Sequence, residues 1–184
     1  MSTVALNRPA RVAGRAASVL VALALIALAA TLLALQEQFR DVEARVAAFL
    51  MDPFVHGRTA PAGSIVWFGL GTQQVTGFQI TTLCSTVILV TPLLAAAGLM
   101  LLVRPLALGR VLVGLAIGTG IVTLCNLLRY GFAAIAMQTW GSDGFELVHR
   151  YLGSLLVIAG FIAAVILLLR FATMRSTPQR GRHS

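Results

Sequence analysis

Three side chains in this 184-residue sequence could together carry out nucleophilic chemistry on a carbonyl group: Cys84, Arg129 and His149. A thiolate can attack the carbonyl carbon, a cationic donor can stabilise the oxyanion that forms, and an imidazole can move the proton. A metal site is disfavoured because only Cys84 and His149 are plausible ligands, and the sequence has no Cys-x-x-Cys pair. We therefore expect neither a metal nor another cofactor.

Each of these residues also has a structural explanation. Cys84 could be a packed membrane cysteine, although it stands near the start of a helix, where backbone N–H groups favour negative charge. Arg129 could be an interfacial anchor, yet arginine inside a span is costly, and Asn126 adds a polar group to its helical face. His149 alone would be an ordinary interfacial residue. Cys125 is predicted to pack deeper in the membrane, and a Cys84–Cys125 disulfide stays open.

The elements that must position these residues are strongly apolar. Hydrophobic residues make up 58% of the chain and charged residues 11%, against roughly 25% charged in a soluble domain. A soluble globular fold is thereby excluded. Four apolar blocks are each long enough to cross a bilayer core of roughly 30 Å: 16–35, 80–103, 111–137 and 151–171. We predict an all-α integral membrane protein with four transmembrane helices in one domain (1–175), followed by a disordered cytoplasmic tail (176–184).

The charges predict an orientation. Arginines cluster before the first block, between the second and third, and after the fourth, and these three regions contain no acid. The six acids lie in the other two connections: Glu37, Asp41, Glu43, Asp52, Asp143 and Glu146. The positive-inside rule then places both termini in the cytoplasm and the acidic connections outside. The first block exceeds the roughly 7–15 residues of a signal-peptide core, so we expect a retained anchor. The net charge of +8 follows from this topology, and we expect no nucleic-acid partner.

Helix geometry predicts that the three chemically capable residues converge. Counted from the cytoplasmic ends of their helices, Cys84, Arg129 and His149 lie roughly 28, 27 and 31 Å up at about 1.5 Å per residue. All three therefore belong at the outer interface of the membrane, on three different helices.

The first outer connection, 36–79, is predicted to begin as an amphipathic extension of the first helix that ends at Asp52-Pro53. Its apolar face is expected to hold residues that recur at spacings of three and four: Leu35, Phe39, Val42, Val46 and Phe49. Farther along, the apolar run 65–68, the Gly69–Gly71 turn signal and residues 75–80 indicate a short hairpin. Two interpretations stay open for this connection: an interfacial flap with aromatic anchors, or a wall of a substrate groove.

Three motifs carry a resemblance to a known family: Thr82-Leu-Cys84-Ser85 opens one span, Asn126-Leu-Leu-Arg129 lies in the next, and His149-Arg-Tyr-Leu-Gly153 opens the last. Together they resemble the exosortase/archaeosortase family, over roughly residues 78–160. Thr86 stands where that pattern has a glycine, and Thr82-Leu83 stands where it has Glu-Ala. Family members are polytopic membrane cysteine proteases, thought to act as transpeptidases.

The resemblance implies a set of roles: Cys84 as nucleophile, Arg129 as oxyanion stabiliser and His149 as acid/base, supported by Ser85 and Asn126. It also implies that the substrates are secreted proteins with a C-terminal motif, a transmembrane helix and a basic cluster. We expect a multi-pass protein of the cell (cytoplasmic) membrane, in contact with lipid, whose site faces outside. The alternative is a non-enzymatic membrane scaffold or assembly partner in which the same polar residues hold helices together.

Overall fold

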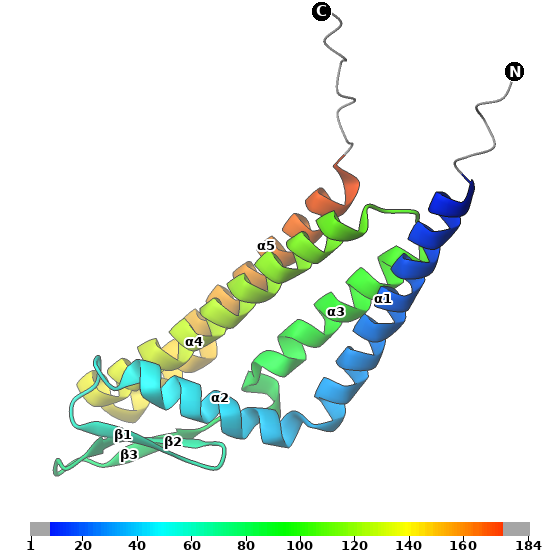
Figure 1. The fold of residues 1–184 in the computed structure, drawn as a ribbon. Coiled ribbons are helices and arrows are strands. Elements are labelled where there is room, and N and C mark those ends of the chain that lie inside the picture. The colour runs from blue at the N-terminus through cyan, green and yellow to red at the C-terminus, as the bar shows by residue number, and fades with distance from the viewer. Residues whose placement is uncertain (1–7, 175–184) are drawn as a thin grey trace, which may run out of the picture.

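The computed structural model describes residues 8–174, and side chains from residue 14. The five helices are α1 (Arg8–Ala34), α2 (Gln36–Met51), α3 (Thr86–Val103), α4 (Leu108–Glu146) and α5 (Gly153–Thr173). Two single turns, η2 (Thr82–Cys84) and η3 (Leu147–Leu152), precede α3 and α5. Three strands, β1 (Arg58–Ala62), β2 (Ile65–Leu70) and β3 (Thr76–Gln79), form an antiparallel sheet at one end of the bundle (Figure 1). The predicted tail, 176–184, lies outside the described residues.

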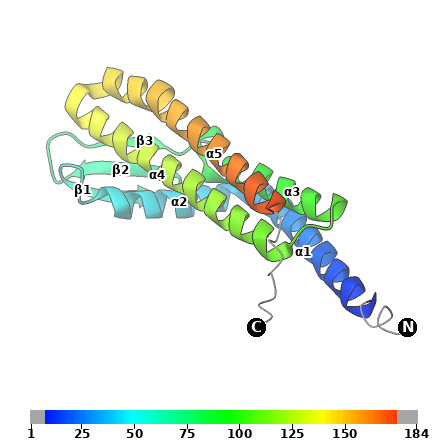
Figure 2. The same ribbon diagram turned by 90° about the horizontal axis from the view of Figure 1, so that it is seen from above.

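The protein is mostly helical, and three helical stretches within residues 8–174 are long and apolar enough to cross a membrane: Gly14–Ala34, Thr86–Val103 and Leu108–Thr173. The last stretch is a hairpin in which α4 and α5 run side by side (Figure 1, Figure 2). The predicted start of the second span at residue 80 is wrong, because the α3 helix begins only at Thr86. The predicted third span ends at residue 137, whereas the helix α4 continues to Glu146, with non-helical backbone angles at Gly141.

Small residues set the helix contacts within the bundle. A Cβ added to Gly98 on α3 would stand 2.9 Å from the Ala22 carbonyl oxygen of α1, and one added to Gly114 would stand 2.9 Å from Cβ of Phe171 on α5. Without side chains at these glycines the helix backbones approach closely. Arg15 of α1 also donates to carbonyl oxygens at the C-terminal end of α3, including Leu101 O at 3.1 Å. The guanidinium thus satisfies groups that the helix leaves unpaired.

The helix α2 buries a different face from the one predicted. Its buried residues are three alanines, Ala44, Ala47 and Ala48, and Met51 in the last turn, whereas the predicted stripe from Leu35 to Phe49 is exposed. Alanines let α2 lie close to the sheet and to α4, which the larger Phe and Val side chains would prevent. The exposed stripe instead gives α2 an apolar outer surface of the kind that suits a membrane interface.

The sheet contains the predicted hairpin and one strand that the sequence analysis missed. Strands β2 and β3 pair with Val66 opposite Phe78, and Gly69 and Gly71 in the turn between them adopt positive φ angles. The unpredicted strand β1 is joined to the end of α2 by Asp52, whose Oδ1 accepts hydrogen bonds from the Thr59 N–H at 2.7 Å and hydroxyl at 2.9 Å. These bonds to the carboxylate hold the pKa of Asp52 below its ordinary value of 3.8.

Two large hydrophobic clusters and a small one of Ala133, Ala136 and Val148 hold the molecule together. The membrane core joins α1, α3, α4 and α5 and contains Ala22, Ala29, Leu93, Leu94, Ala97, Leu101, Val111, Leu115, Val122, Ala164, Leu168 and Ala172. The outer core joins α2, the sheet and α4 and contains Ala44, Ala47, Ala48, Met51, Val55, Val66, Phe68, Phe78, Ile80, Tyr130 and Ala134. The residues predicted to do chemistry lie beside the outer core.

The buried face of α2 can be tested with two matched substitutions. Ala44 is 0% exposed, so Ala44→Leu should overpack the outer core and lower the free energy of unfolding by about 1–3 kcal/mol. Val42 is 52% exposed, so Val42→Leu should leave the melting temperature of the detergent-solubilised protein unchanged. If Val42→Leu were the more destabilising of the two, the predicted stripe would be the packed face after all.

Candidate active site

The structure brings Cys84, Arg129 and His149 together, from η2, α4 and η3 respectively. Cys84 Sγ lies 3.4 Å from His149 Nε2 and 3.7 Å from Arg129 Nη2. The third side of the triangle, from Arg129 Nη2 to His149 Nε2, is 3.4 Å. A thiol, a cation and an imidazole therefore meet at a partly buried point, although they are far apart in the sequence.

Arg129 points into the bundle and is 8% exposed. Its Nε donates to the carbonyl oxygen of His149 at 3.3 Å, which ties the side chain to the start of the last helical segment. The two salt bridges found in residues 8–174 involve other arginines, so the partners of this guanidinium are sulfur, imidazole and a carbonyl. A buried cation without a carboxylate can stabilise negative charge that develops on a neighbouring group.

The ring of His149 is held by an aromatic side chain. It stacks on Phe145 with ring centroids 5.1 Å apart and an interplanar angle of 9°, and Phe145 in turn packs against Phe78 of β3. A guanidinium can only donate, so the Arg129 contact is a hydrogen bond in the tautomer that carries its ring proton on Nδ1 and leaves Nε2 as the acceptor. The same Nε2 lone pair faces the thiol of Cys84 and can take its proton.

The backbone at Cys84 is fixed through its carbonyl oxygen. Asn126 Nδ2 donates to this oxygen at 2.8 Å, and the hydroxyl of Tyr130, one helical turn farther along α4, donates to it as well. Both side chains are fully buried. Asn126 thus holds the backbone of Cys84 from α4. Tyr130, which holds the same carbonyl, was not among the residues that the sequence analysis singled out, because it looks like an ordinary core aromatic.

Ser85 contacts neither the sulfur of Cys84 nor the imidazole among the hydrogen bonds of residues 8–174. It is the N-cap of α3, where its Oγ accepts from the Val87 N–H at 3.3 Å. Its hydroxyl donates to Oε2 of Glu43 at 2.7 Å. Ser85 therefore supports the site by fixing the start of the helix that follows Cys84.

Glu43 is a second residue near the thiol, after Tyr130, that the sequence analysis missed. It reaches from α2 to the start of α3, where its Oε1 accepts from the Thr86 N–H at 2.7 Å and from the Thr86 hydroxyl. Asn126 Nδ2 lies 3.2 Å from the same oxygen. One sequence signal could have found it, because Glu43 falls four residues after Phe39 and three before Val46, on the stripe predicted to be apolar.

The second cysteine is separate from this group. Cys125 is half-buried, and its Sγ lies 2.6 Å from where a Cβ on Gly160 of α5 would stand. Cys84 and Cys125 are both free in the structure, so no disulfide joins them. Cys125 packs between α4 and α5.

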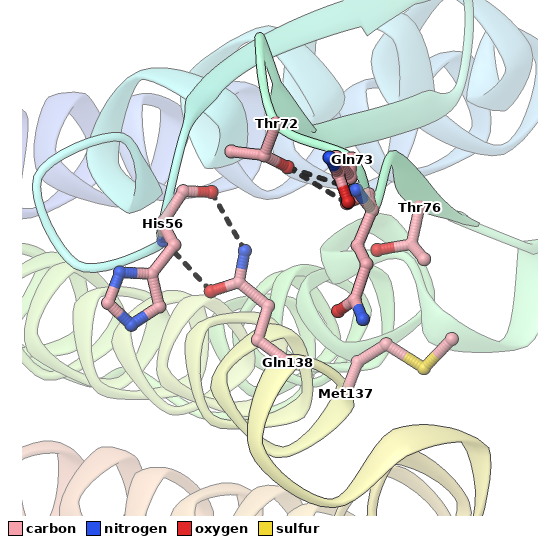
Figure 3. A pocket seen from close by; sticks show the side chains of 7 residues that line it. His56, Thr72, Gln73, Thr76, Met137 and Gln138 are labelled. Atoms are coloured by element: carbon pink, nitrogen blue, oxygen red, sulfur yellow. Dashed lines mark hydrogen bonds between the residues drawn. The ribbon is translucent and has the colours of Figure 1, made fainter.

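Three cavities lie near the outer core, one of them, of about 650 Å³, between α2 and β1. A polar one of about 310 Å³, drawn in Figure 3, is lined by His56, residues 72–74, Thr76, Met137 and Gln138, none of which belongs to the group around the thiol. There the Gln138 amide clamps the backbone of His56 through two hydrogen bonds of 2.9 Å (Figure 3). A mainly apolar cavity of about 300 Å³ opens between α2, α3 and α4 and reaches Glu43 and Thr86.

No family model, curated protein or solved structure matches this chain. The chemistry open to the site therefore follows from its geometry: a thiol with a proton acceptor at 3.4 Å and a cationic donor at 3.7 Å can act as a nucleophile toward a carbonyl carbon. Within residues 8–174, His, Cys, Asp and Glu side chains form no group of three or more that could hold a metal ion.

The position of Arg129 depends on Gly153, which gives a test. A Cβ at residue 153 would stand 2.6 Å from Arg129 Cγ and 2.9 Å from the Val148 carbonyl oxygen. Gly153→Ala should displace the guanidinium and destabilise the protein by about 1–3 kcal/mol. The matched control is Gly131→Ala on α4, where an added Cβ meets nothing within 4 Å.

The measurements are the melting temperature in detergent and the rate at which iodoacetamide alkylates Cys84. Gly153→Ala should lower the first and alter the second, and Gly131→Ala should leave the alkylation rate unchanged. Equal behaviour of the two variants would contradict the close packing of Arg129 against residue 153.

Proposed function

We propose that this protein is a membrane-embedded cysteine protease or transpeptidase of the exosortase type, which cleaves C-terminal sorting signals of secreted proteins at the outer face of the membrane. One observation carries the proposal: Cys84 Sγ lies 3.4 Å from His149 Nε2 and 3.7 Å from Arg129 Nη2. These contacts unite the three motifs on which the family resemblance rests. A nucleophile, a proton acceptor and a cationic donor are the groups that acyl transfer through a thioester needs.

The proposed topology has four transmembrane helices, α1, α3, α4 and α5, with both termini in the cytoplasm. Two observations support it. The start of α1 and the end of α5 lie at the same end of the bundle, opposite to the sheet (Figure 1). The arginine-rich regions that lack acids adjoin that end, which the positive-inside rule assigns to the cytoplasm. The site at Cys84 would then face outside, where secreted substrates are exposed.

The proposed reaction begins when Cys84 passes its thiol proton to His149 Nε2 and its sulfur attacks the carbonyl carbon of the scissile peptide bond. The C–N bond then breaks, and the leaving amine takes the proton from His149. The upstream part of the substrate stays on the enzyme as a thioester. Water or an amine next attacks this thioester while His149 accepts the incoming proton, and the proton returns to the sulfur as the product leaves.

Arg129 would stabilise the oxyanion of both tetrahedral intermediates. Its Nε and Nη2 already have partners in the site, whereas Nη1 has no hydrogen-bond partner among the described residues. A planar guanidinium can hold the sulfur and His149 through two nitrogens and still donate through the third. This division of donors supports a role in the transition state as well as in the resting site.

The proposed substrates carry a C-terminal motif, a transmembrane helix and a basic cluster. A helix of this kind would bring the residues just before it to the outer surface of the membrane, at the level proposed for Cys84. The basic cluster would stay in the cytoplasm for the reason that keeps the arginines of this chain there. Cleavage would free the secreted part of the substrate from its membrane tail.

The central test is processing of a co-expressed candidate substrate, a secreted protein that ends in a motif, an apolar helix and arginines. Mass spectrometry should find a new C-terminus with the wild-type protein and none with Cys84→Ala, because that variant lacks the thiol that lies beside His149 and Arg129. The matched control, Cys125→Ala, should process like wild type. Processing by Cys84→Ala would contradict the mechanism.

A second test separates catalysis by Arg129 from anchoring. Arg129→Lys keeps the charge but loses the planar fork, so the rate of substrate cleavage should fall about 100-fold. The control is Arg150→Lys, because Arg150 is exposed and pairs only with Glu146 among the described residues. Unchanged turnover in Arg129→Lys would show that Arg129 is only an anchor.

The non-enzymatic alternative, a membrane scaffold or assembly partner, predicts a different thiol chemistry. Labelling with a membrane-impermeant maleimide from outside, with and without denaturant, distinguishes the two hypotheses. If the protein is a protease, we expect the maleimide to label Cys84 and to leave Cys125 unlabelled in the native protein. If neither cysteine is labelled without denaturant, the scaffold hypothesis is favoured.

A further inference from the structure

We propose that Glu43 is a positioning residue for the thiol of Cys84: from a helix outside the bundle it fixes the backbone that directly follows the cysteine side chain, from the Cys84 carbonyl to the Thr86 N–H. The inference rests on the proposed function only in calling Cys84 the nucleophile. Its argument comes from hydrogen bonds that converge on a single carboxylate.

Both carboxylate oxygens of Glu43 are engaged. Oε2 accepts from the Ser85 hydroxyl at 2.7 Å, and Oε1 accepts from the Thr86 N–H at 2.7 Å and from the Thr86 hydroxyl. These are the two residues that follow Cys84 in the chain. The carboxylate also sits at the N-terminus of α3, where the helix dipole and free N–H groups favour negative charge.

Glu43 also contacts the groups that hold the carbonyl of Cys84. Asn126 Nδ2 lies 3.2 Å from Glu43 Oε1 and 2.8 Å from the Cys84 carbonyl oxygen. The Tyr130 hydroxyl lies 3.4 Å from Glu43 Oε1 and donates to the same carbonyl. One side chain therefore links the C=O of residue 84 with the N–H of residue 86, and the direction of the thiol depends on both.

Glu43 makes no hydrogen bond to the sulfur, to Arg129 or to His149 among residues 8–174, so its effect on the thiol passes through other residues. This separates it from the groups that face Cys84 itself. Those groups are the His149 imidazole from η3 and the Arg129 guanidinium from α4. The remaining ionisable groups nearby are Tyr130 on α4 and, on α2, Glu43 and Arg40, whose Nη1 donates to the Ile80 carbonyl at 3.5 Å.

The test measures the thiol and needs no substrate. Iodoacetamide alkylation of Cys84 and Cys125 is followed by mass spectrometry over a pH series, on the full-length protein in detergent. Removal of the Glu43 carboxylate should release the thiol from Arg129, so Glu43→Gln should raise the pH midpoint of Cys84 alkylation by about one unit. Arg129→Gln should raise it in the same direction, and the double variant should add nothing further.

The sign of the shift decides between two explanations. If Glu43 acted only through its negative charge, Glu43→Gln would make a thiolate easier to form and would lower the midpoint. Glu43→Asp sharpens the comparison, since it keeps the charge but loses the reach: positioning predicts a raised midpoint, and charge alone predicts the wild-type value. Glu43→Asp also provides the test on its own if Glu43→Gln folds poorly.

Two controls complete the experiment. Glu37→Gln removes an acid from the same helix, at a side chain that is 83% exposed, and should leave both midpoints unchanged. Cys125 is the internal reference, and its midpoint should stay constant in every variant. An unchanged Cys84 midpoint together with a lower melting temperature would overturn the proposal and leave Glu43 a purely structural residue. Failure of Cys84→Ala to stop substrate processing would instead refute the proposed function and leave this measurement intact.

Discussion

The pairing of polar groups on the inner face of α4 is the constraint on which the outer half of this protein depends. Asn126 and Arg129 are buried among apolar helices, where an unpaired amide or guanidinium is costly. Arg129 meets no salt-bridge partner among the side chains of residues 14–174. The amide is held by the Cys84 carbonyl and the Glu43 carboxylate, and the guanidinium by sulfur, imidazole and a carbonyl. These hydrogen bonds of Asn126 and Arg129 therefore require η2, α2 and η3 to meet beside the inner face of α4.

This requirement gives the elements outside the bundle a role in the site. The helix α2 approaches through its alanines and delivers Glu43 to the start of α3. The sheet contributes Phe78, which packs against Tyr130 and Phe145, and Phe145 stacks on His149. The imidazole is thus oriented by aromatic packing, with no hydrogen-bond partner on its buried Nδ1 among the described residues. The outer connection, 36–79, therefore supports the thiol and the imidazole. This role is additional to that of an interfacial flap, which its aromatic residues suggested.

Much of this arrangement follows from short-range regularities of the chain. A rise of about 1.5 Å per residue predicts that Cys84, Arg129 and His149 lie at one level, because helices of similar length start from one cytoplasmic boundary. The packed face of α2 could not be predicted in this way. Periodicity identifies the more hydrophobic face of a helix, but here small side chains pack inward and large ones point outward, as happens when lipid can replace water as the neighbour. The role of Glu43 escaped prediction because its partners lie more than forty residues away along the chain.

The sequence by itself determined the membrane class, the apolar segments and the three residue types able to do chemistry, because composition, hydropathy and helix rise are local properties. Tertiary structure alone decided which acid holds the backbone beside the thiol, which side of α2 is buried and why residue 153 is glycine. Those outcomes depend on which surfaces meet, and the surfaces that meet are those that pair most of the buried polar groups while the backbones stay in close contact. Gly153 illustrates the point: its missing side chain leaves room for the stem of Arg129.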